Sequence, residues 1–353
     1  MGNSNPKLLI VDDSALMRRT LRDLFDGLGR YEVQTARNGA DALVQIERFN
    51  PDVVTLDVNM PEMDGLTCLS HIMARFPRPV VMVSSITRKG AQATLEALAL
   101  GAVDFVEKPG GTVSLDIDLV AAALVRKVDA ATRARPRIAK AIASATRQRT
   151  EAAKPRPSVG ERAIAGLVLV GVSTGGPRTL EDILPALPAS FPWPIVVAQH
   201  MPAAFTASFA ARLDGICALH VLEANGATPL ARGNVYIGRG GADVVIERIL
   251  GRAVVKSIPE DDSFRWHPSV DRLVASAMTV LPPGSLVGVE LTGMGDDGAR
   301  AMTELVKAGG RTIAEDSSTA IVFGMPAELI RLGGASKVLP SDRIADQLAT
   351  WIL

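Results

Sequence analysis

The chain has 353 residues, of which 47% are apolar and 22% charged, and this length suits about two folded domains. These values exclude a wholly disordered chain, a collagen-like fibre and a small disulfide-rich protein. The 38 basic and 38 acidic residues balance, which disfavours a chain devoted to binding nucleic acid.

Residues 1–128 alternate short apolar runs with amphipathic stretches. The runs that are typical of buried parallel strands lie at 8–11, 53–56, 80–83 and 105–106. Between the first two runs, from 17 to 28, apolar residues recur at the spacing of a helix. Strands that alternate with helices predict a doubly wound α/β domain with a parallel sheet, like that of flavodoxin.

Ionisable and hydroxyl side chains stand at the predicted carboxyl ends of these strands. Asp12 and Asp13 follow the run at 8–11, and Asp57 follows the run at 53–56. Ser84 follows the run at 80–83, and Lys108 comes shortly after the run at 105–106. Ligands bind at this edge of an open α/β sheet, and three carboxylates gathered there repel one another unless a cation such as Mg²⁺ lies among them. We expect the lysine and the hydroxyl to hold the oxygens of a phosphoryl group.

Residues 129–160 are predicted to link this domain to the next. The segment carries eight basic and two acidic residues, has almost no large apolar ones, and includes Lys-Pro-Arg-Pro-Ser at 154–158. Such a composition buries little surface, so we expect a linker that is helical at first and extended near the prolines. A solvated tether is one interpretation, and a basic docking element for an acidic partner is the other.

Residues 161–353 repeat the alternation and predict a second doubly wound, Rossmann-like domain. Its clearest strands are expected at 167–170, 195–198 and 286–289, and its helices at 202–213, 268–281 and 297–308. Three further apolar runs follow one another with little room for helices, at 234–237, 244–246 and 254–255. We predict that these runs form an antiparallel hairpin insertion.

The strand at 167–170 runs into Gly-Val-Ser-Thr-Gly-Gly-Pro, a G-x-S-x-G pattern centred on Ser173. A nucleophile on such a turn is exposed, and backbone N–H groups at the start of the next helix can stabilise an oxyanion. A Gly-rich phosphate-binding turn looks similar, so the motif by itself leaves both interpretations open.

The positions of the histidines favour the interpretation that Ser173 is a nucleophile. His200 ends the strand at 195–199, where a catalytic base would stand beside Ser173. His267 is a second candidate for the base, and His220 is expected in the sheet or core as part of a strand at 218–222.

A carboxylate that orients the base should complete the set. The strand at 286–291 ends in a Gly-rich turn that carries Asp296 and Asp297, although either could be only a helix N-cap. The chain order serine, histidine, acid differs from that of α/β-hydrolases, so a different fold would carry the same chemistry.

The first domain resembles the receiver domain of two-component response regulators, on the residues above and on Met-Pro-Glu-Met-Asp-Gly after Asp57. The resemblance implies that Asp57 is the phosphoacceptor. It implies a Mg²⁺ site formed by Asp12, Asp13, Asp57 and the backbone carbonyl of Asn59. Lys108 would pair with the phosphoryl group, Ser84 would be the switch hydroxyl, and Phe105 takes the place of the switching aromatic residue.

The second domain resembles the chemotaxis methylesterase (CheB) family, through GVSTGGP, QHMP, LTGMGDDGA and a C-terminal GMP. The resemblance implies that Ser173 is the nucleophile, His200 the base and Asp297 the orienting acid. Thr174 and Met294 match positions that line the family's site. No cofactor is implied for this domain.

The combined resemblance implies a phosphorylation-activated enzyme that demethylates glutamate methyl esters on chemoreceptors, releases methanol and deamidates receptor glutamines. Its partners would be methyl-accepting chemoreceptors and a chemotaxis histidine kinase, with no nucleic acid, and a monomer is the simplest state. His267 stands where the family has another residue, which leaves local substrate contacts open. The alternatives are a regulator whose second domain binds without catalysis and a DNA-binding regulator.

The termini and cysteines indicate where the protein works. Cys68 and Cys217 are the only cysteines and form no CxxC motif, which fits a reducing compartment. No apolar run approaches the ~20 residues that span a bilayer, and the N-terminus lacks the apolar stretch of a signal peptide. We expect a cytoplasmic protein without membrane insertion.

Overall fold

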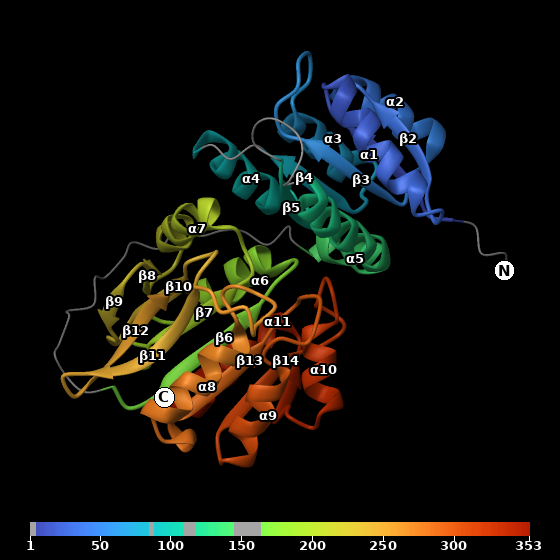
Figure 1. The fold of residues 1–353 in the computed structure, drawn as a ribbon. Coiled ribbons are helices and arrows are strands. Elements are labelled where there is room, and N and C mark those ends of the chain that lie inside the picture. Colours follow the sequence, from blue (N-terminus) through green and yellow to red (C-terminus); the bar gives the residue numbers. More distant parts are fainter. Residues whose placement is uncertain (1–4, 85–87, 109–116, 145–163) are drawn as a thin grey trace. The chain divides into compact units, whose positions relative to one another are not determined.

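The computed structural model describes residues 5–84, 88–108, 117–144 and 164–353. The chain divides into two compact units, Met1–Arg147 and Gln148–Leu353, and each is built on its own parallel sheet (Figure 1). Among the helices that the structure describes, none combines the length and the apolarity needed to cross a bilayer.

Five parallel strands form the sheet of the first unit: β1 (Lys7–Val11), β2 (Glu32–Ala36), β3 (Val53–Asp57), β4 (Val80–Ser84) and β5 (Asp104–Glu107). Their order is β2-β1-β3-β4-β5, as in flavodoxin, and β3 and β4 are buried along their whole length. The chain reverses direction across the sheet between β1 and β3. The carboxyl ends of these two strands therefore flank the point at which such folds bind ligands.

Five helices cover the two faces of this sheet: α1 (Ala15–Gly27) and α5 (Ile117–Ser144) on one, and α2 (Gly39–Phe49), α3 (Gly65–Arg75) and α4 (Arg88–Leu100) on the other. A short polar residue occupies the N-cap position of three of these helices. The side chains of Ser14, Asn38 and Asp64 accept hydrogen bonds from N–H groups of the first turn, which satisfies donors that a helix start leaves unpaired.

Helix α5 extends the first unit beyond the boundary expected at residue 128. Asp129 accepts a hydrogen bond from the hydroxyl of Tyr31 and pairs with Arg30 at 2.7 Å. Ala130 and Ala131 are buried beside them. The first five residues of the expected linker, 129–133, therefore lie in a helix whose described side chains contact the first unit, and the expected linker from 145 on lies outside the described residues.

Seven parallel strands form the main sheet of the second unit: β6 (Leu167–Val172), β7 (Ile195–Gln199), β8 (His220–Ala224), β10 (Asn234–Gly238), β13 (Leu286–Glu290), β14 (Arg311–Glu315) and β15 (Lys337–Leu339). Their order is β15-β14-β13-β6-β7-β10-β8. The sheet is doubly wound from β6 outward, so its switch point lies between β6 and β13.

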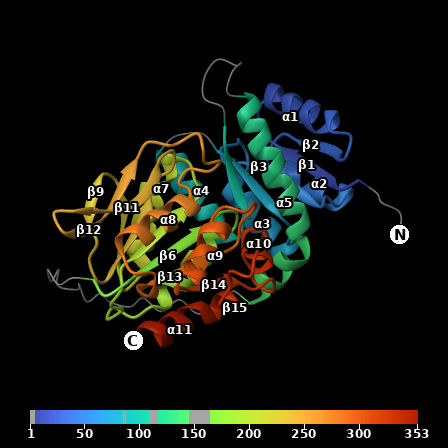
Figure 2. The ribbon, with the colours of Figure 1, turned by 60° about the horizontal axis from the view of Figure 1, so that its bottom comes forward.

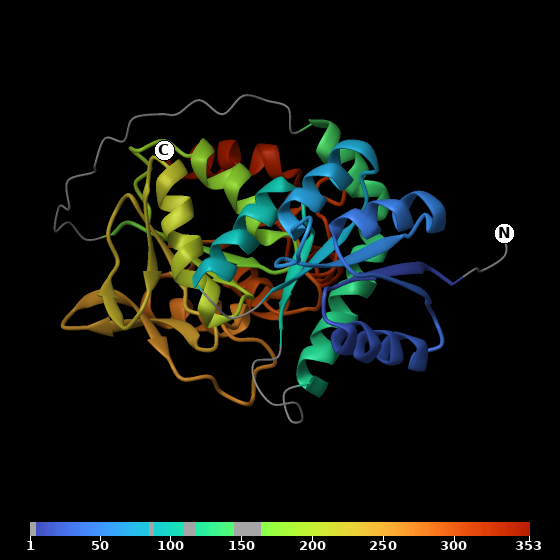
Figure 3. The same ribbon diagram turned by 90° about the horizontal axis from the view of Figure 1, so that it is seen from above.

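Two layers of helices enclose this sheet (Figure 2, Figure 3). One layer consists of α6 (Gly176–Ile183), α7 (Ala203–Ile216) and α11 (Ser341–Ile352). The other consists of α8 (Val270–Val280), α9 (Ala299–Lys307) and α10 (Met325–Arg331). The three helices expected in this domain are α7, α8 and α9, each within a few residues of its expected bounds.

The antiparallel insertion differs from the expected one in one of its three strands. Strands β11 (Asp243–Ile249) and β12 (Arg252–Ile258) form the hairpin, and β9 (Ala227–Pro229) pairs with β12 to make a three-stranded sheet. The run at 234–237 was assigned to this insertion, which is wrong, because it is the parallel strand β10 between β7 and β8. The sequence at 234–237 does not distinguish parallel pairing with β7 and β8 from an antiparallel hairpin.

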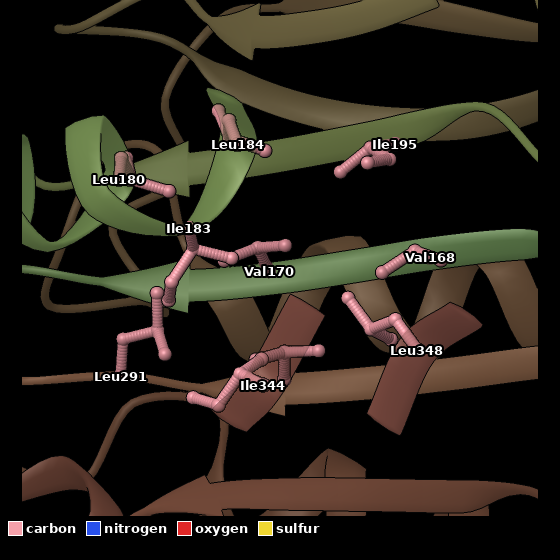
Figure 4. A pocket seen from close by; sticks show the side chains of 10 residues that line it. Val168, Val170, Leu180, Ile183, Leu184, Ile195, Leu291, Ile344 and Leu348 are labelled. Atoms are coloured by element: carbon pink, nitrogen blue, oxygen red, sulfur yellow. The ribbon is translucent and has the colours of Figure 1, made fainter. Parts of the chain in front are cut away.

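A small apolar cavity lies between the main sheet and helices α6 and α11. Side chains of Val168 and Val170 from β6 and of Ile344 and Leu348 from α11 border it (Figure 4). Its volume of about 10 Å³ is at the lower limit for a single water, and its apolar walls offer that water no hydrogen bond. We interpret it as a packing void in the core.

Candidate active site

Three strand ends meet at the switch point of the second unit. Ser173 follows β6, His200 follows β7, and the turn at 291–298 follows β13. The backbone N–H of Ser173 donates to the carbonyl of Thr292 at 2.9 Å, and that of His200 donates to the carbonyl of Val172 at 3.0 Å. Main-chain hydrogen bonds therefore hold the three segments side by side.

Glycines allow the close approach of the chain around Ser173. Gly175 has a φ of +81° and sits at the N-cap of α6. A Cβ on Gly293 would lie 2.7 Å from the Cβ of Ser173, so only glycine fits against the serine there. Ser173 itself is half-buried, on the turn before a helix start whose first N–H groups lack intrahelical partners. Such groups can stabilise a developing oxyanion.

The imidazole of His200 pairs with a buried carboxylate. Its Nε2 lies 2.9 Å from the Oδ2 of Asp297, and the histidine side chain is 9% exposed. Its Nδ1 is buried and has no hydrogen-bond partner in the part of the chain that the structure describes. Nδ1 is therefore the nitrogen that is free to exchange a proton with a neighbouring hydroxyl.

Asp297 is fixed in place by the start of helix α8. Its carboxylate accepts hydrogen bonds from the hydroxyl of Ser269 at 3.0 Å and from the N–H groups of Val270 and Asp271 at 2.7 and 3.0 Å. Burial alone would raise the pKa of this carboxyl, but the hydrogen bond and charge of His200 and the two N–H groups outweigh it, so the pKa lies below its usual range. The neighbouring Asp296 is exposed.

Thr174 and Met294, which were expected to line this site, lie in the turns that carry Ser173 and Asp297. Thr174 is buried and accepts a hydrogen bond at its carbonyl from the hydroxyl of Thr292 at 2.8 Å, and Met294 is half-buried. His267 pairs through Nδ1 with Asp243 at 3.2 Å and makes no hydrogen bond with Ser173 among those described. His220 lies on β8, which confirms its expected place in the sheet, and its exposed side chain pairs with Asp214 at 2.9 Å.

Sequence reasoning missed two polar groups at this site. The amide Nε2 of buried Gln199 donates to the carbonyl of Ser173 at 3.0 Å and to that of His200 at 3.2 Å. Thr292 donates to Thr174 and accepts from the N–H of Val322 at 2.9 Å. Gln199 lies in the motif QHMP and Thr292 in LTGMGDDGA, so their membership in these motifs could have indicated both residues.

Aromatic contact with the base was also missed. The ring of Trp266 is parallel to that of His200, with centroids 5.7 Å apart and an interplanar angle of 2°. Nothing in the local sequence around Trp266 indicates this contact.

Two buried glutamates end the strands behind the site. Burial, reinforced by the charges of Asp297 and Asp271, raises the pKa of Glu290 well above its usual range. Burial raises the pKa of Glu315 to about 7, although the N–H of Thr292 donates to this carboxyl at 2.8 Å and opposes the rise. Neither residue was identified from the sequence, because the apolar run that predicts each strand does not indicate a buried acid at its end.

The first unit brings together the acids expected at its switch point. Lys108 Nζ lies 2.8 Å from Asp12 and 2.7 Å from Asp57, both of which are buried. Asp13 is exposed, and one oxygen of each of the three acids lies within 4.8 Å of the others. Three converging carboxylates match the oxygen ligands that Mg²⁺ prefers, so the donor set fits this ion.

Burial and charge set the protonation of this cluster. Burial, with the charge of Asp12, raises the pKa of Asp57, although Lys108 opposes the rise. Burial would lower the pKa of Lys108, but its pairing with both carboxylates outweighs this effect and raises it. The raised pKa means that the carboxyl of Asp57 binds its proton more tightly than usual, so a bound cation must compete with that proton.

Three more residues were expected at the phosphoryl site of this unit. The N–H of Asn59 donates to Asp57 at 3.3 Å. Ser84 is fully buried and donates to the carbonyl of Gly90 at 3.4 Å. Phe105 is buried with Lys127 Nζ 5.1 Å from its ring centre. Of the neighbouring residues expected at the strand ends, 85 and 109 lie outside the described residues.

Comparison with protein families matches both units. Residues 168–348 match the CheB methylesterase family, and residues 8–118 match the response regulator receiver domain. The two matched segments contain the site around Ser173 and the acidic cluster around Asp57, respectively.

Relatives of known name cover nearly the whole chain. A protein-glutamate methylesterase/protein-glutamine glutaminase 3 from Rhodospirillum rubrum is 54% identical over 98% of this chain and 96% of its own. A protein-glutamate methylesterase/protein-glutamine glutaminase 2 from Rhodopseudomonas palustris is 50% identical over 98% of each chain. The crystal structure of the Thermotoga maritima CheB methylesterase catalytic domain is 39% identical, with a TM-score of 0.51, over 53% of this chain and 98% of that one.

Proposed function

The chain belongs to the CheB methylesterase family, and we propose that it hydrolyses glutamate methyl esters on chemoreceptors and releases methanol. The observation that carries this proposal is the pairing of His200 with buried Asp297 at the strand ends where Ser173 also lies. The names of the two relatives add deamidation of protein glutamine, which uses the same acyl chemistry with ammonia as the leaving group.

Acylation uses the free nitrogen of the base. The Nδ1 of His200 takes the proton of the Ser173 hydroxyl as Oγ attacks the ester carbonyl carbon. Asp297, which holds Nε2–H, fixes the tautomer and stabilises the imidazolium that forms. Backbone N–H groups of the turn between Ser173 and α6 stabilise the oxyanion. The imidazolium then protonates the departing methoxy oxygen, the C–O bond breaks, and methanol leaves an acyl-enzyme.

Deacylation repeats these steps with water. His200 takes a proton from water, whose oxygen attacks the acyl carbon. The bond to Ser173 Oγ breaks, the serine recovers its proton, and the glutamate carboxyl group is released.

We propose further that phosphorylation of Asp57 activates the enzyme. Lys108, which already contacts Asp57, would pair with the phosphoryl oxygens, and Ser84 and Phe105 would respond to them. A Mg²⁺ ion held by Asp12, Asp13, Asp57 and the carbonyl of Asn59 would neutralise the charge that gathers during transfer. An interface that favours one domain arrangement by a few kcal/mol is sufficient for such a switch.

The partners and location follow the same proposal. Methyl-accepting chemoreceptors supply the substrate, a chemotaxis histidine kinase supplies the phosphoryl group, and the protein works as a monomer in the cytoplasm.

Methanol release from methylated receptor membranes tests the proposal. The assay compares wild type with Ser173→Ala, His200→Gln and Asp57→Asn, each with and without a small phosphodonor and Mg²⁺. His220→Gln, which alters an exposed histidine, and Asp23→Asn, which alters an exposed acid, are the matched controls.

We expect release that rises with phosphodonor in wild type and in both controls. Ser173→Ala and His200→Gln should lose it by about 10⁴-fold or more, and Asp57→Asn should ignore the phosphodonor. Wild-type release without a phosphodonor response would leave the esterase and refute the switch. A folded wild type that accepts phosphate but releases no methanol would favour the non-catalytic regulator.

A further inference from the structure

The indole of Trp266 lies against the imidazole that the proposed reaction uses as its base. The two rings are parallel within 2° and their centroids are 5.7 Å apart, which is the range of offset stacking. Trp266 is half-buried and lies outside the three residues assigned to the acyl chemistry. It covers one face of a ring that must exchange a proton at Nδ1.

The chain makes room for this indole. Gly295 has a φ of +100°, and a Cβ there would lie 2.6 Å from Cζ2 of Trp266. A larger residue at 295 would displace the ring. The indole therefore packs on bare backbone in the same turn that carries Asp297, so one side chain contacts both the base and the loop of its partner.

Further contacts fix the segment that carries Trp266. The guanidinium of Arg265 lies 5.5 Å from the indole centroid. Fully buried Asp243 accepts hydrogen bonds from Nδ1 of His267 at 3.2 Å and from the N–H of Ser269 at 2.8 Å. Ser269 in turn holds Asp297, so the segment from 265 to 269 is tied to the acid as well as to the base.

A stacked indole is suited to a base that alternates between its neutral and protonated forms. Rotation of the imidazole would move Nδ1 away from the nucleophile, and a parallel ring beside it opposes that rotation. The indole face carries negative partial charge, which stabilises the imidazolium formed after proton transfer. Both effects act on the proton-transfer step and need no contact with the receptor.

We propose that Trp266 is a positioning residue for His200, one that holds the orientation of the imidazole and favours its protonated form. The inference rests on the proposed function, because His200 acts there as the base. It predicts a loss in kcat and in the acylation rate of Ser173, with little change in KM.

Trp266→Ala, Trp266→Phe and the control Trp351→Phe test this role. Trp351 lies on α11 with Arg311 4.9 Å from its ring, so the control also removes a tryptophan with a cationic neighbour. Methanol release gives kcat and KM, and labelling of Ser173 by a small fluorophosphonate measures reactivity without a receptor. We expect Trp266→Ala to lower kcat and the labelling rate by about two- to tenfold, with Phe restoring most of both.

Fluorescence reports the contact itself. An imidazole stacked on an indole alters the emission of that indole, so the emission lost in Trp266→Phe relative to wild type should change when it is measured in the His200→Gln background. The emission lost in Trp351→Phe should be the same in both backgrounds.

The outcomes separate the proposal from its alternatives. A raised KM with unchanged kcat and unchanged labelling in Trp266→Ala would overturn it and make the indole a receptor contact. Emission of Trp266 that does not respond to His200→Gln would also overturn it, because the stack would then be absent in solution. If wild type labels as expected and its Trp266 emission responds to His200→Gln, but it releases no methanol, the proposed substrate fails while the positioning role stands.

Discussion

The Nε2 of His200 lies 2.9 Å from the carboxylate of Asp297, although 97 residues separate them in the chain. The two follow strands β7 and β13, which flank β6 on opposite sides, and the serine follows β6 itself. A doubly wound sheet therefore brings a base and an acid together at its switch point from two halves of the domain. This arrangement leaves only Nδ1 for the proton of Ser173.

Asp297→Asn should therefore remove most of the activity while the fold persists. The amide cannot accept from Nε2–H as a charged partner, so the imidazole loses its preferred tautomer and the stabilisation of its cation. We expect kcat to fall by about 10³- to 10⁴-fold, measured by methanol release.

Asp296→Asn is the matched control, because the adjacent carboxylate is exposed and makes no hydrogen bond to His200 among those described. We expect its activity to stay within about twofold of wild type. Equal losses in both variants would contradict the assignment of Asp297 as the orienting acid.

Mg²⁺ should be required for phosphorylation of the first unit. Removal of the metal with a chelator, or Asp13→Asn, takes away the cation or one of its three carboxylate ligands. We expect the rate at which Asp57 gains a phosphoryl group from a small donor to fall by at least tenfold, measured by the intact mass of the protein. Asp23→Asn should label like wild type, and labelling of Asp13→Asn at the wild-type rate in Mg²⁺ would refute the site.

Strand ends were predictable because parallel strands leave a clear pattern. Short apolar runs followed by Asp57, Ser173 or His200 indicate both the strand and the edge on which each side chain lies. The fold class of both units followed from that alternation, and the comparisons bear it out.

Contacts between distant segments were not predictable in this way. The strand at 234–237 joins the main sheet because β7 and β8 leave a place between them, and spacing along the chain does not reveal this. Asp129 belongs to a helix that contacts Tyr31 from 98 residues away, whereas composition alone placed it in a linker. Trp266 reaches His200 through a loop that has no periodic pattern.

Glu315 should make the second unit less stable as the pH rises. Burial raises its folded-state pKa from 4.5 to about 7, with the charges of Asp182 and Asp316 adding to the rise. Between these values the unfolded chain has released the proton and the folded chain keeps it, so the free energy of unfolding falls with increasing pH. Glu315→Gln stays neutral, and we expect its stability relative to wild type to improve by about 2 kcal/mol from pH 5 to pH 8.

Urea unfolding followed by tryptophan fluorescence measures this effect, since all three tryptophans lie in the second unit. Glu304→Gln alters an exposed acid on α9 and should show no such trend. A pH-independent difference between Glu315→Gln and wild type would show that the carboxyl is ionised throughout the range.

Gln199 should be required for both stability and activity, because its amide joins the serine turn to the histidine turn. Gln199→Glu preserves the shape of the side chain but removes the two N–H donors that reach the carbonyls of Ser173 and His200. Oxygen would then face oxygen in a buried site, at a cost of about 1–3 kcal/mol in the free energy of unfolding. Gln347→Glu, at a half-buried position on α11, is the control.

We expect slower methanol release in Gln199→Glu even where the unit remains folded, since the main chain that positions both catalytic groups is no longer held. Wild-type release from a destabilised Gln199→Glu would limit this amide to a structural role.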